Sequence, residues 1–241
     1  PVPDAPATPA DIPPPIHPLL PVRDLGVVGY EEAFDEQRAT HARVLAQRDT
    51  PSTPLGELLL LEHPPVITLS KRASAADHLL ASREILEQHG VALHETDRGG
   101  DITYHGPGQL VAYPVLDLNR LKLGLHDYMR ALEEIVIDTC TDFGVPAQRD
   151  PDATGVWTTH NPSAKLCAMG IRVRRWVSMH GFALNNTTNL DHFALIVPCG
   201  LAGRPVTSLE RETGGGQPDM PTLKAGVAER FRAWIAGRVE T

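Results

Sequence analysis

Apolar residues in this 241-residue chain occur in short runs that glycine, proline and charged residues interrupt. Residues 58–61 are four leucines in a row, and residues 166–173 and 177–184 are two β-rich runs with a short break between them. Runs of this length predict strands, and the second pair predicts a β-hairpin. Residues 125–143 and 223–239 differ, because their apolar side chains recur at spacings of three and four and so predict amphipathic helices.

Shorter elements are expected between these landmarks. Strands are expected at 25–30, 66–69, 91–95, 109–118 and 194–197, and helices at 31–48 and 82–89. Paired strands mixed with a few helices predict an α+β (mixed α/β) fold, in which helices pack on a mixed sheet. Since there is neither an internal repeat nor an obvious linker after residue 23, a single domain is expected.

The first 22 residues are unlike the rest of the chain. They contain nine prolines and almost no charge. Proline fixes φ and lacks an N–H donor, so this segment can build neither a helix nor a sheet. We expect residues 1–22 to be a disordered proline-rich tail and residues 23–241 to form the folded domain.

Composition excludes several classes of function. The formal net charge of −8 argues against nucleic acid as a partner, since phosphate binding needs clustered lysine and arginine. No apolar stretch approaches the roughly 18 residues that span a bilayer, and the N-terminus lacks the pattern of a signal peptide. Three cysteines without paired spacing predict a reducing compartment, so we expect a cytoplasmic protein with no membrane partner. The eleven histidines form no metal-binding motif, and no metal is expected.

The segment 98–109, Arg-Gly-Gly-Asp-Ile-Thr-Tyr-His-Gly-Pro-Gly-Gln, is rich in glycine. Glycine costs backbone entropy on folding but lets N–H groups approach a ligand closely. Two interpretations remain open at this point: two tight turns around one short strand, or a ligand-binding loop. The spacing and ending of a phosphate-binding P-loop are absent.

Two later segments carry reactive side chains. Lys165 opens an apolar strand, where burial of an ammonium group is costly unless it is paired, although it could also reach solvent at the strand end. Cys199 follows a short apolar run and a proline and precedes Gly200, which leaves room for a substrate carbonyl beside the sulfur. It could equally be a small buried residue. Cys140 is expected in the core, and Cys167 is a weaker rival nucleophile.

Taken together, these segments resemble the lipoyl(octanoyl) transferases of protein lipoylation. The match runs from about residue 24 to residue 235, and Lys165 and Cys199 correspond to the catalytic pair of that family. The matching motifs are Glu62-His63-Pro64, 98–109, Gly155-Val156-Trp157, Ala164-Lys165, Met169-Gly170-Ile171-Arg172, His180-Gly181-Phe182-Ala183-Leu184-Asn185 and Pro198-Cys199-Gly200. The resemblance makes 23–241 an octanoyltransferase catalytic domain with a fold like that of the biotin and lipoate protein ligases.

The resemblance also implies a reaction, partners and a site. Octanoyl would pass from octanoyl-acyl carrier protein to a lysine of a lipoyl domain, in a 2-oxoacid dehydrogenase E2 subunit or the glycine cleavage H protein. No cofactor is implied. The family's substrate-binding positions fall here on Arg98, Gly99, Gly100, Asp101, Ile102, Thr103, Tyr104, His105, Ala168, Met169, Gly170, Gly181, Phe182 and Ala183.

A mechanism follows for the proposed pair. A nearby cation favours the thiolate of a cysteine, so Lys165 is expected to take the proton of Cys199 and later that of the acceptor amine. His105 is a second base candidate for which we favour substrate positioning. The acyl pocket is expected to be lined by Tyr104, Met169, Ile171 and Phe182. The alternative is an ATP-dependent lipoate or biotin-type ligase, which would need no cysteine.

Because acyl carrier and lipoyl domains are acidic, docking would need a local basic surface. The candidate residues are Lys71, Arg72, Arg172, Arg174, Arg175 and Arg204.

Overall fold

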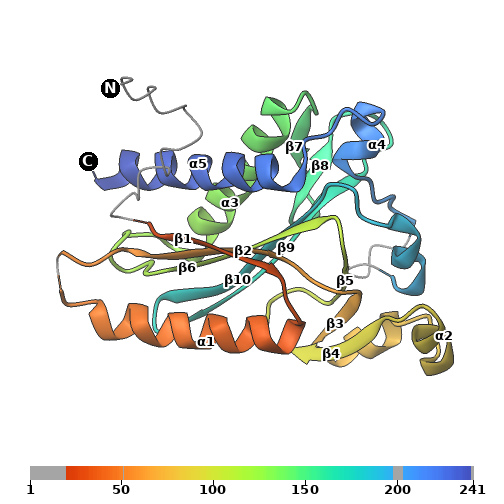
Figure 1. The fold of residues 1–241 in the computed structure, drawn as a ribbon, viewed down its shortest axis with the longest axis horizontal. Helices are drawn as coiled ribbons and strands as arrows, with labels where there is room; N and C mark the ends of the chain where they lie inside the picture. The colour runs from red at the N-terminus through yellow and green to blue at the C-terminus, as the bar shows by residue number, and fades with distance from the viewer. Residues whose placement is uncertain (1–19, 51, 198–202, 240–241) are drawn as a thin grey trace, which may run out of the picture.

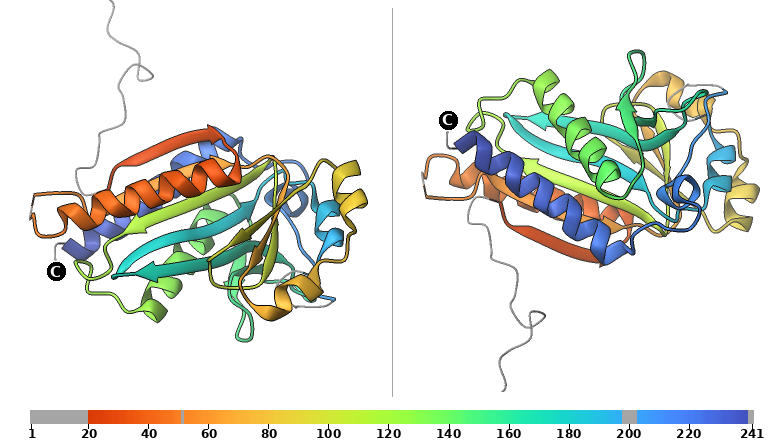
Figure 2. Two further views of the ribbon diagram at one scale, coloured as in Figure 1. Left: turned by 90° about the horizontal axis from the view of Figure 1, so that it is seen from below. Right: turned by 90° about the horizontal axis from the view of Figure 1, so that it is seen from above.

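A computed structural model describes residues 20–50, 52–197 and 203–239. Two β-sheets dominate it (Figure 1). One long helix covers one face of the larger sheet and two cover the other face, while the smaller sheet stands at one end of the larger (Figures 1 and 2). This is the mixed α/β arrangement that the sequence predicts.

The larger sheet has seven strands in the order β1-β2-β6-β10-β9-β8-β7. Only the β1–β2 pair is parallel, so the sheet is mixed as expected. The predicted hairpin is β9–β10, whose strands pair in continuous antiparallel register. The strands are β1 (Val22–Val27), β2 (Gly56–Glu62), β6 (Gln109–Leu116), β7 (Ala147–Arg149), β8 (Val156–Thr158), β9 (Lys165–Arg174) and β10 (Val177–Asn185).

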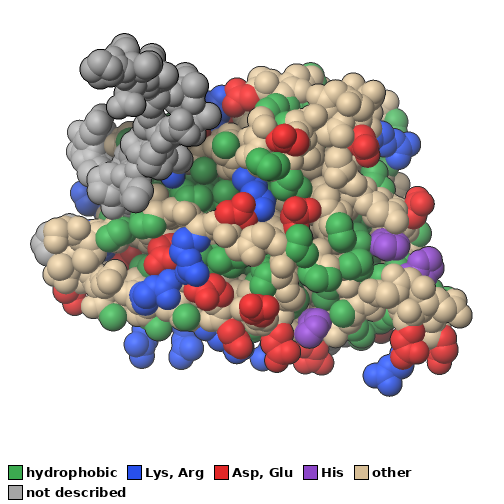
Figure 3. Space-filling view, viewed as in Figure 1, with side chains coloured by type: hydrophobic (Ala, Val, Ile, Leu, Met, Phe, Trp, Pro, Cys, Tyr) green, Lys and Arg blue, Asp and Glu red, His purple; other side chains and the backbone are tan. Residues whose placement is uncertain are grey.

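Three long helices bury the two faces of this sheet. α3 (Leu125–Asp142) and α5 (Met220–Val239) contact each other on one face and enclose the main hydrophobic core. In α3 the buried side chains of Leu132, Val136 and Cys140 recur every four residues, which is the periodicity read from the sequence. α1 (Tyr30–Gln47) covers the other face. Figure 3 shows acidic side chains over one half of α1 and basic ones over the other.

The smaller sheet has the strand order β4-β3-β5, with β3 parallel to β4 and antiparallel to β5. It carries a hydrophobic cluster of its own. Its strands are β3 (Val66–Ser70), β4 (Ala92–Thr96) and β5 (Ile102–His105), and the short helices near it are η2 (Ala73–His78), α2 (Arg83–Gln88) and η3 (Leu190–Leu195); α4 (Leu209–Thr213) precedes α5. The chain passes between the sheets from β2 to β3 and from β5 to β6, and the candidate site lies where the two sheets meet.

Two expectations need correction. The strand expected at 194–197 is wrong: η3, capped by the Asn189 side chain, extends to Leu195, and only Ile196 makes an isolated bridge, to Leu79. The folded chain also begins before residue 23, because Leu20 is fully buried in the main core and β1 starts at Val22. The rest of the expected tail, 1–19, lies outside the described residues.

No helix within the described part of the chain is both long and apolar enough to cross a bilayer.

Candidate active site

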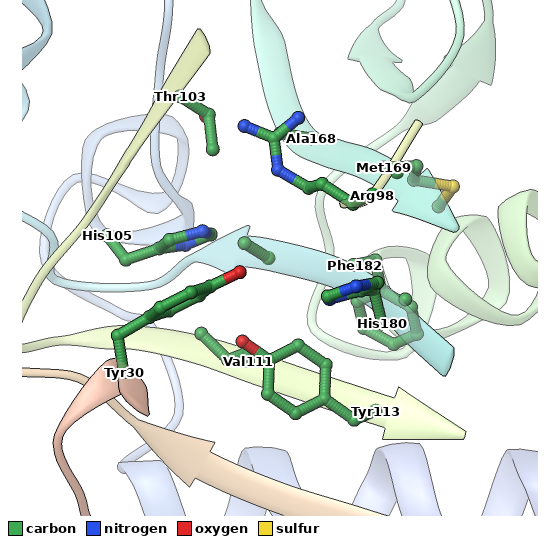
Figure 4. Close-up of a pocket in the computed structure, with 13 residues that line it drawn as sticks. Tyr30, Arg98, Thr103, His105, Val111, Tyr113, Ala168, Met169, His180 and Phe182 are labelled. Atoms are coloured by element: carbon green, nitrogen blue, oxygen red, sulfur yellow. The ribbon is translucent and has the colours of Figure 1, made fainter. Parts of the chain in front are cut away.

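A pocket lies where the two sheets meet, and its empty space, with the open solvent at its mouth included, is about 410 Å³ (Figure 4). Its walls come from α1, the loop after β4, and strands β5, β6, β9 and β10. The lining residues are Tyr30, Arg98, Thr103, His105, Val111, Tyr113, Ala168, Met169, Gly170, His180, Gly181, Phe182 and Ala183. The structure therefore brings together nine of the sequence-predicted substrate-binding residues in one place.

Strand alternation decides which residues of β5 reach the cavity. Thr103 and His105 line it, whereas Ile102 and Tyr104 belong to the hydrophobic cluster of the small sheet. The Tyr104 hydroxyl lies 2.8 Å from His192 Nδ1, and burial raises the pKa of Tyr104 to about 12. The expectation that Tyr104 forms a wall of the acyl pocket is therefore not met. Asp101 also faces elsewhere, with Oδ2 2.7 Å from His78 Nδ1.

A second, open groove adjoins the cavity and shares Met169 and Gly170 with it. Gly99 and Gly100 line this groove instead of the cavity, as do Lys165 and Ile171. The Gly99 N–H donates to Ile171 O at 2.9 Å, and a Cβ on Gly170 would stand 2.5 Å from Gly99 O. Gly99 and Gly170 thus allow close backbone packing at the rim of the site.

Lys165 is only 7% exposed, although it lines the groove. Its ammonium lies 4.8 Å from the centroid of the Trp157 ring, within cation–π range. The Trp157 indole N–H donates to Ala153 O at 3.2 Å, which fixes the plane of the ring. The Lys165 backbone pairs with the following segment, since its N–H donates to Pro205 O and its carbonyl accepts from Thr207 N.

Gly155 packs closely against Lys165, so a substitution at Gly155 shows how tightly the surroundings of the lysine are packed. Its φ is +121°, and a Cβ would meet Cys167 O at 2.5 Å and Lys165 Cε at 3.4 Å. We expect Gly155→Ala to lower the free energy of unfolding by about 2–4 kcal/mol, from backbone strain and overpacking. Gly237→Ala, in an exposed part of α5 with nothing within 4 Å, should be neutral or slightly stabilising. Urea unfolding of both variants checks this, and equal stabilities would contradict it.

Three buried histidines line or support the cavity, and sequence reasoning assigned a role only to His105. The pKa of His63 falls to about 4, and those of His105 and His180 to about 3, mainly because burial penalises the charged ring. All three rings are therefore neutral near pH 7. His180 is also strained, with a φ of +58°, and its Nε2 lies 2.8 Å from Asp97 Oδ1.

The other cavity residues that sequence reasoning missed are Tyr30, Val111, Tyr113 and His180. His180 stands within a motif of the resemblance, but that motif does not say which of its residues face a cavity. Tyr30 and Tyr113 come from α1 and β6, and no sequence signal connects these elements to the glycine-rich segment.

Arg98 crosses the upper part of the cavity in Figure 4. Its Nη2 donates to both the carbonyl and the hydroxyl oxygen of Thr68, each at 2.9 Å, so the β3 strand orients the guanidinium. The positive charge helps to lower the pKa values of His105 and His180.

The expected basic docking surface is divided by the fold. Arg172 pairs with Asp97, and Arg204 pairs with Asp150 at 2.5 Å while stacking on Trp157. Arg174 and Arg175 lie at the end of β9 that is farthest from Lys165. Of the six candidate cations, Arg72 lines the groove, and none of the other five lines either the groove or the cavity.

Cys199 lies outside the described residues, and the segments on both sides of it are anchored. Before it, the Val197 N–H donates to His78 O at 2.8 Å. After it, Arg204 stacks on Trp157 with 3.6 Å between the guanidinium carbon and the ring centroid. The rival Cys167 is fully buried, and burial raises the pKa of its thiol well above the usual range despite the nearby charge of Lys165. Cys140 is a core residue, as expected, with a pKa raised to about 12 by burial.

Among the described residues, no group of three or more histidine, cysteine or carboxylate side chains could hold a metal ion.

Known proteins resemble this chain in sequence and in fold. The model of the lipoyl protein ligase A/B catalytic domain family matches residues 30–232. A protein of Geotalea uraniireducens (strain Rf4) named Octanoyltransferase is 46% identical, over 88% of this chain and 91% of that protein. A Koribacter versatilis (strain Ellin345) protein of the same name is 54% identical over 65% of this chain, and the chain spans 63% of that relative's length.

Solved structures support the fold alone, because their sequence identities are low. A lipoate-protein ligase A bound with ATP superposes with a TM-score of 0.66 at 12% identity, over 88% of this chain and 83% of that one. A biotin protein ligase of Aquifex aeolicus, in complex with biotin and ATP, gives a TM-score of 0.51 at 13% identity, over 91% and 70%. The expected likeness to both kinds of ligase is confirmed. By its match over most of its length, the chain belongs to the lipoyl protein ligase A/B catalytic domain family.

Proposed function

We propose that this chain transfers an octanoyl group from octanoyl-acyl carrier protein to a lysine of a lipoyl domain, through a thioester on Cys199. The observation that carries the proposal is a buried lysine, Lys165, in a groove that adjoins the cavity between the two sheets. Its backbone pairs with Pro205 and Thr207, a few residues after Cys199. Six residues of chain span at most about 20 Å, and this limit is compatible with the proposed pairing of Lys165 with Cys199.

In the first half-reaction, neutral Lys165 takes the proton of the Cys199 thiol. The thiolate attacks the carbonyl carbon of the donor thioester, and a new C–S bond replaces the bond to the carrier. The departing carrier thiolate takes the proton back from Lys165. One thioester is exchanged for another, so the step needs no nucleotide.

In the second half-reaction, the amine of the acceptor lysine attacks the octanoyl-Cys199 carbonyl. Neutral Lys165 accepts the proton that the amine loses, and the C–S bond breaks as the amide forms. The proton on Lys165 then returns to the Cys199 sulfur. Substrate-positioning groups in the family's binding segments, including Arg98 and His105, stand in the cavity wall.

The acceptors we propose are the lipoyl domains of 2-oxoacid dehydrogenase E2 subunits and the glycine cleavage H protein, and the compartment is the cytoplasm. No cofactor takes part in the proposed reaction. Mixing the protein with octanoyl-acyl carrier protein and a lipoyl domain, with EDTA and without ATP, should give a lipoyl domain heavier by one octanoyl group. Modification only with free octanoate, ATP and Mg²⁺ would favour the ligase alternative instead.

The kcat/KM of the enzyme should change gradually with the length of the acyl chain. Each buried methylene contributes about 0.8 kcal/mol, so shortening the chain by two carbons should lower kcat/KM by roughly 15-fold. Ala168 lines the cavity, and Ala168→Leu should move the preference toward shorter chains by filling part of it. Competition between acyl carriers of different chain length checks this. Equal rates for two-carbon and sixteen-carbon chains would contradict it.

Cys167→Ala provides a test of the rival nucleophile. Its thiol is buried in the main core and held protonated by its raised pKa, so the variant should transfer octanoyl at a rate within a few-fold of wild type. Loss of transfer in a folded Cys167→Ala protein would reassign the nucleophile.

A further inference from the structure

A series of hydrogen bonds through two buried side-chain amides connects a backbone carbonyl to the imidazole of His105. The Asn185 Nδ2 donates to Thr207 O at 2.9 Å, the Gln109 Nε2 donates to Asn185 Oδ1 at 2.9 Å, and Gln109 Oε1 lies 2.8 Å from His105 Nδ1. The three side chains belong to residues that are 6% exposed or less. Gln109 and Asn185 each end one of the matching motifs, but neither is among the substrate-binding positions that the resemblance implies.

The backbone carbonyl at one end of this hydrogen-bond series determines which group donates in every bond of the series. A backbone carbonyl such as that of Thr207 can only accept, so the Asn185 nitrogen faces it and the Asn185 oxygen accepts from Gln109. The Gln109 nitrogen makes a second bond to the carbonyl of Tyr104 at 3.2 Å, which confirms the orientation of its amide. The Gln109 oxygen is therefore an acceptor, and His105 Nδ1 must carry the proton.

The other ring nitrogen of His105 has the opposite character. A neutral imidazole with a proton on Nδ1 carries a lone pair on Nε2. The ring of His105 points toward the middle of the cavity (Figure 4). It is neutral because burial, with smaller contributions from His63 and Arg98, lowers its pKa to about 3.

Tyr113 presents an acceptor to the same cavity for a similar reason. His63 Nδ1 lies 2.7 Å from Val28 O and must donate to it, so Nε2 of the neutral ring accepts the Tyr113 hydroxyl proton at 2.9 Å. The Tyr113 proton is thereby turned toward His63, and its oxygen lone pairs remain for a ligand. Arg98 supplies a positive charge to this cavity and disfavours an ammonium group there.

We propose that Gln109 and Asn185 are positioning residues that hold His105 as the Nδ1–H tautomer, so that its Nε2 accepts a hydrogen bond from an uncharged N–H or O–H donor in the cavity. Two sources can supply that donor: the neutral amine of the acceptor lysine, or a water molecule bound beside the acyl chain. The expected effect of Gln109 on the rate of acyl transfer rests on the proposed function, whereas the tautomer of His105 does not.

Nitrogen-15 NMR of histidine-labelled protein tests the tautomer. The His105 signals are assigned by their loss in His105→Gln and should show a protonated Nδ1 and an unprotonated Nε2 at pH 7. In Gln109→Met the His105 pattern should move toward the Nε2–H form, while Gln109→Glu, which keeps an acceptor, should preserve it. His63 and His180 are internal controls, because Val28 O and Asp97 hold their protons. A wild-type proton on Nε2, or no change in Gln109→Met, would overturn the proposal.

Separate measurement of the two half-reactions identifies the donor. If the donor is the acceptor amine, Gln109→Met should slow transfer from octanoyl-enzyme to a lipoyl domain by about 10-fold or more and leave octanoyl-enzyme formation unchanged. If it is water, formation of octanoyl-enzyme should slow instead. Equal slowing in Gln109→Met and Gln109→Glu would mean that only packing matters and would overturn the proposal. Failure of the wild type to form octanoyl-enzyme would refute the acyl transfer, and the NMR result would still decide the tautomer.

Discussion

Lys165→Met is expected to lower the rate of octanoyl transfer by a factor of about 100 to 10,000, the usual contribution of a positioned acid–base group. Lys165 is the group that moves protons in both proposed half-reactions, so its loss should affect the two alike. Methionine is similar to lysine in length and can keep the packing of the stem beside Trp157, so the fold should not weaken greatly. Single-turnover transfer and a thermal melt of the same preparation measure the two effects.

Lys224→Met is the matched control for this variant. Lys224 is also buried, at 8% exposure, but it lies on α5 and pairs with Asp24 at 2.7 Å, away from the groove. Its replacement should leave the transfer rate within about 3-fold of wild type even if stability falls. If Lys165→Met kept more than a tenth of the wild-type rate, Lys165 would not be the proton carrier.

Acid is expected to unfold this protein between about pH 4 and 5.5 through its buried histidines. His63, His105 and His180 have folded-state pKa values of about 4, 3 and 3, below the unfolded value of about 6.5. The unfolded chain therefore binds more protons than the folded one in this window. Stability is complete above about pH 6.5 and falls as the pH drops, by roughly 1.4 kcal/mol per pH unit for each group.

Three such groups together give a slope of about 4 kcal/mol per pH unit near pH 5, against a typical total stability of 5–15 kcal/mol. His63→Gln should reduce this slope by about a third, while His126→Gln, whose side chain is 79% exposed, should leave it unchanged. Urea unfolding at a series of pH values between 4.5 and 7 measures the slopes. A stability that is flat across this range would show that the three rings are not held neutral.

Much of the fold was predictable from local patterns. The helix α3 follows from its apolar spacing, and the β9–β10 hairpin from two β-rich runs with a short break. The importance of Lys165 could also be inferred, because a charged residue that opens an apolar strand demands an explanation. By contrast, the run 194–197 could not be assigned from composition, since an isolated apolar stretch of this length fits a strand or a short helix equally well.

The polar wall of the cavity could not be predicted in the same way. His63 follows β2 and His180 lies in β10, and β6 pairs with both of these strands in the large sheet. His105 ends β5 of the small sheet, and its ring centroid lies 5.6 Å from that of His63 because the two sheets meet there. The error at Tyr104 has a related cause. Alternation separates Tyr104 from Thr103 and His105, but which face meets the cavity depends on how the small sheet stands against the large one.

Covalent catalysis on Cys199 can be tested by intact-protein mass spectrometry. Wild type, Cys199→Ser and Cys167→Ala are each mixed with octanoyl-acyl carrier protein in the absence of ATP. Wild type and Cys167→Ala should each gain one octanoyl group that hydroxylamine removes, and Cys199→Ser should gain none. No adduct on the wild type with a carrier shown to be intact, or an adduct that persists in Cys199→Ser, would contradict it.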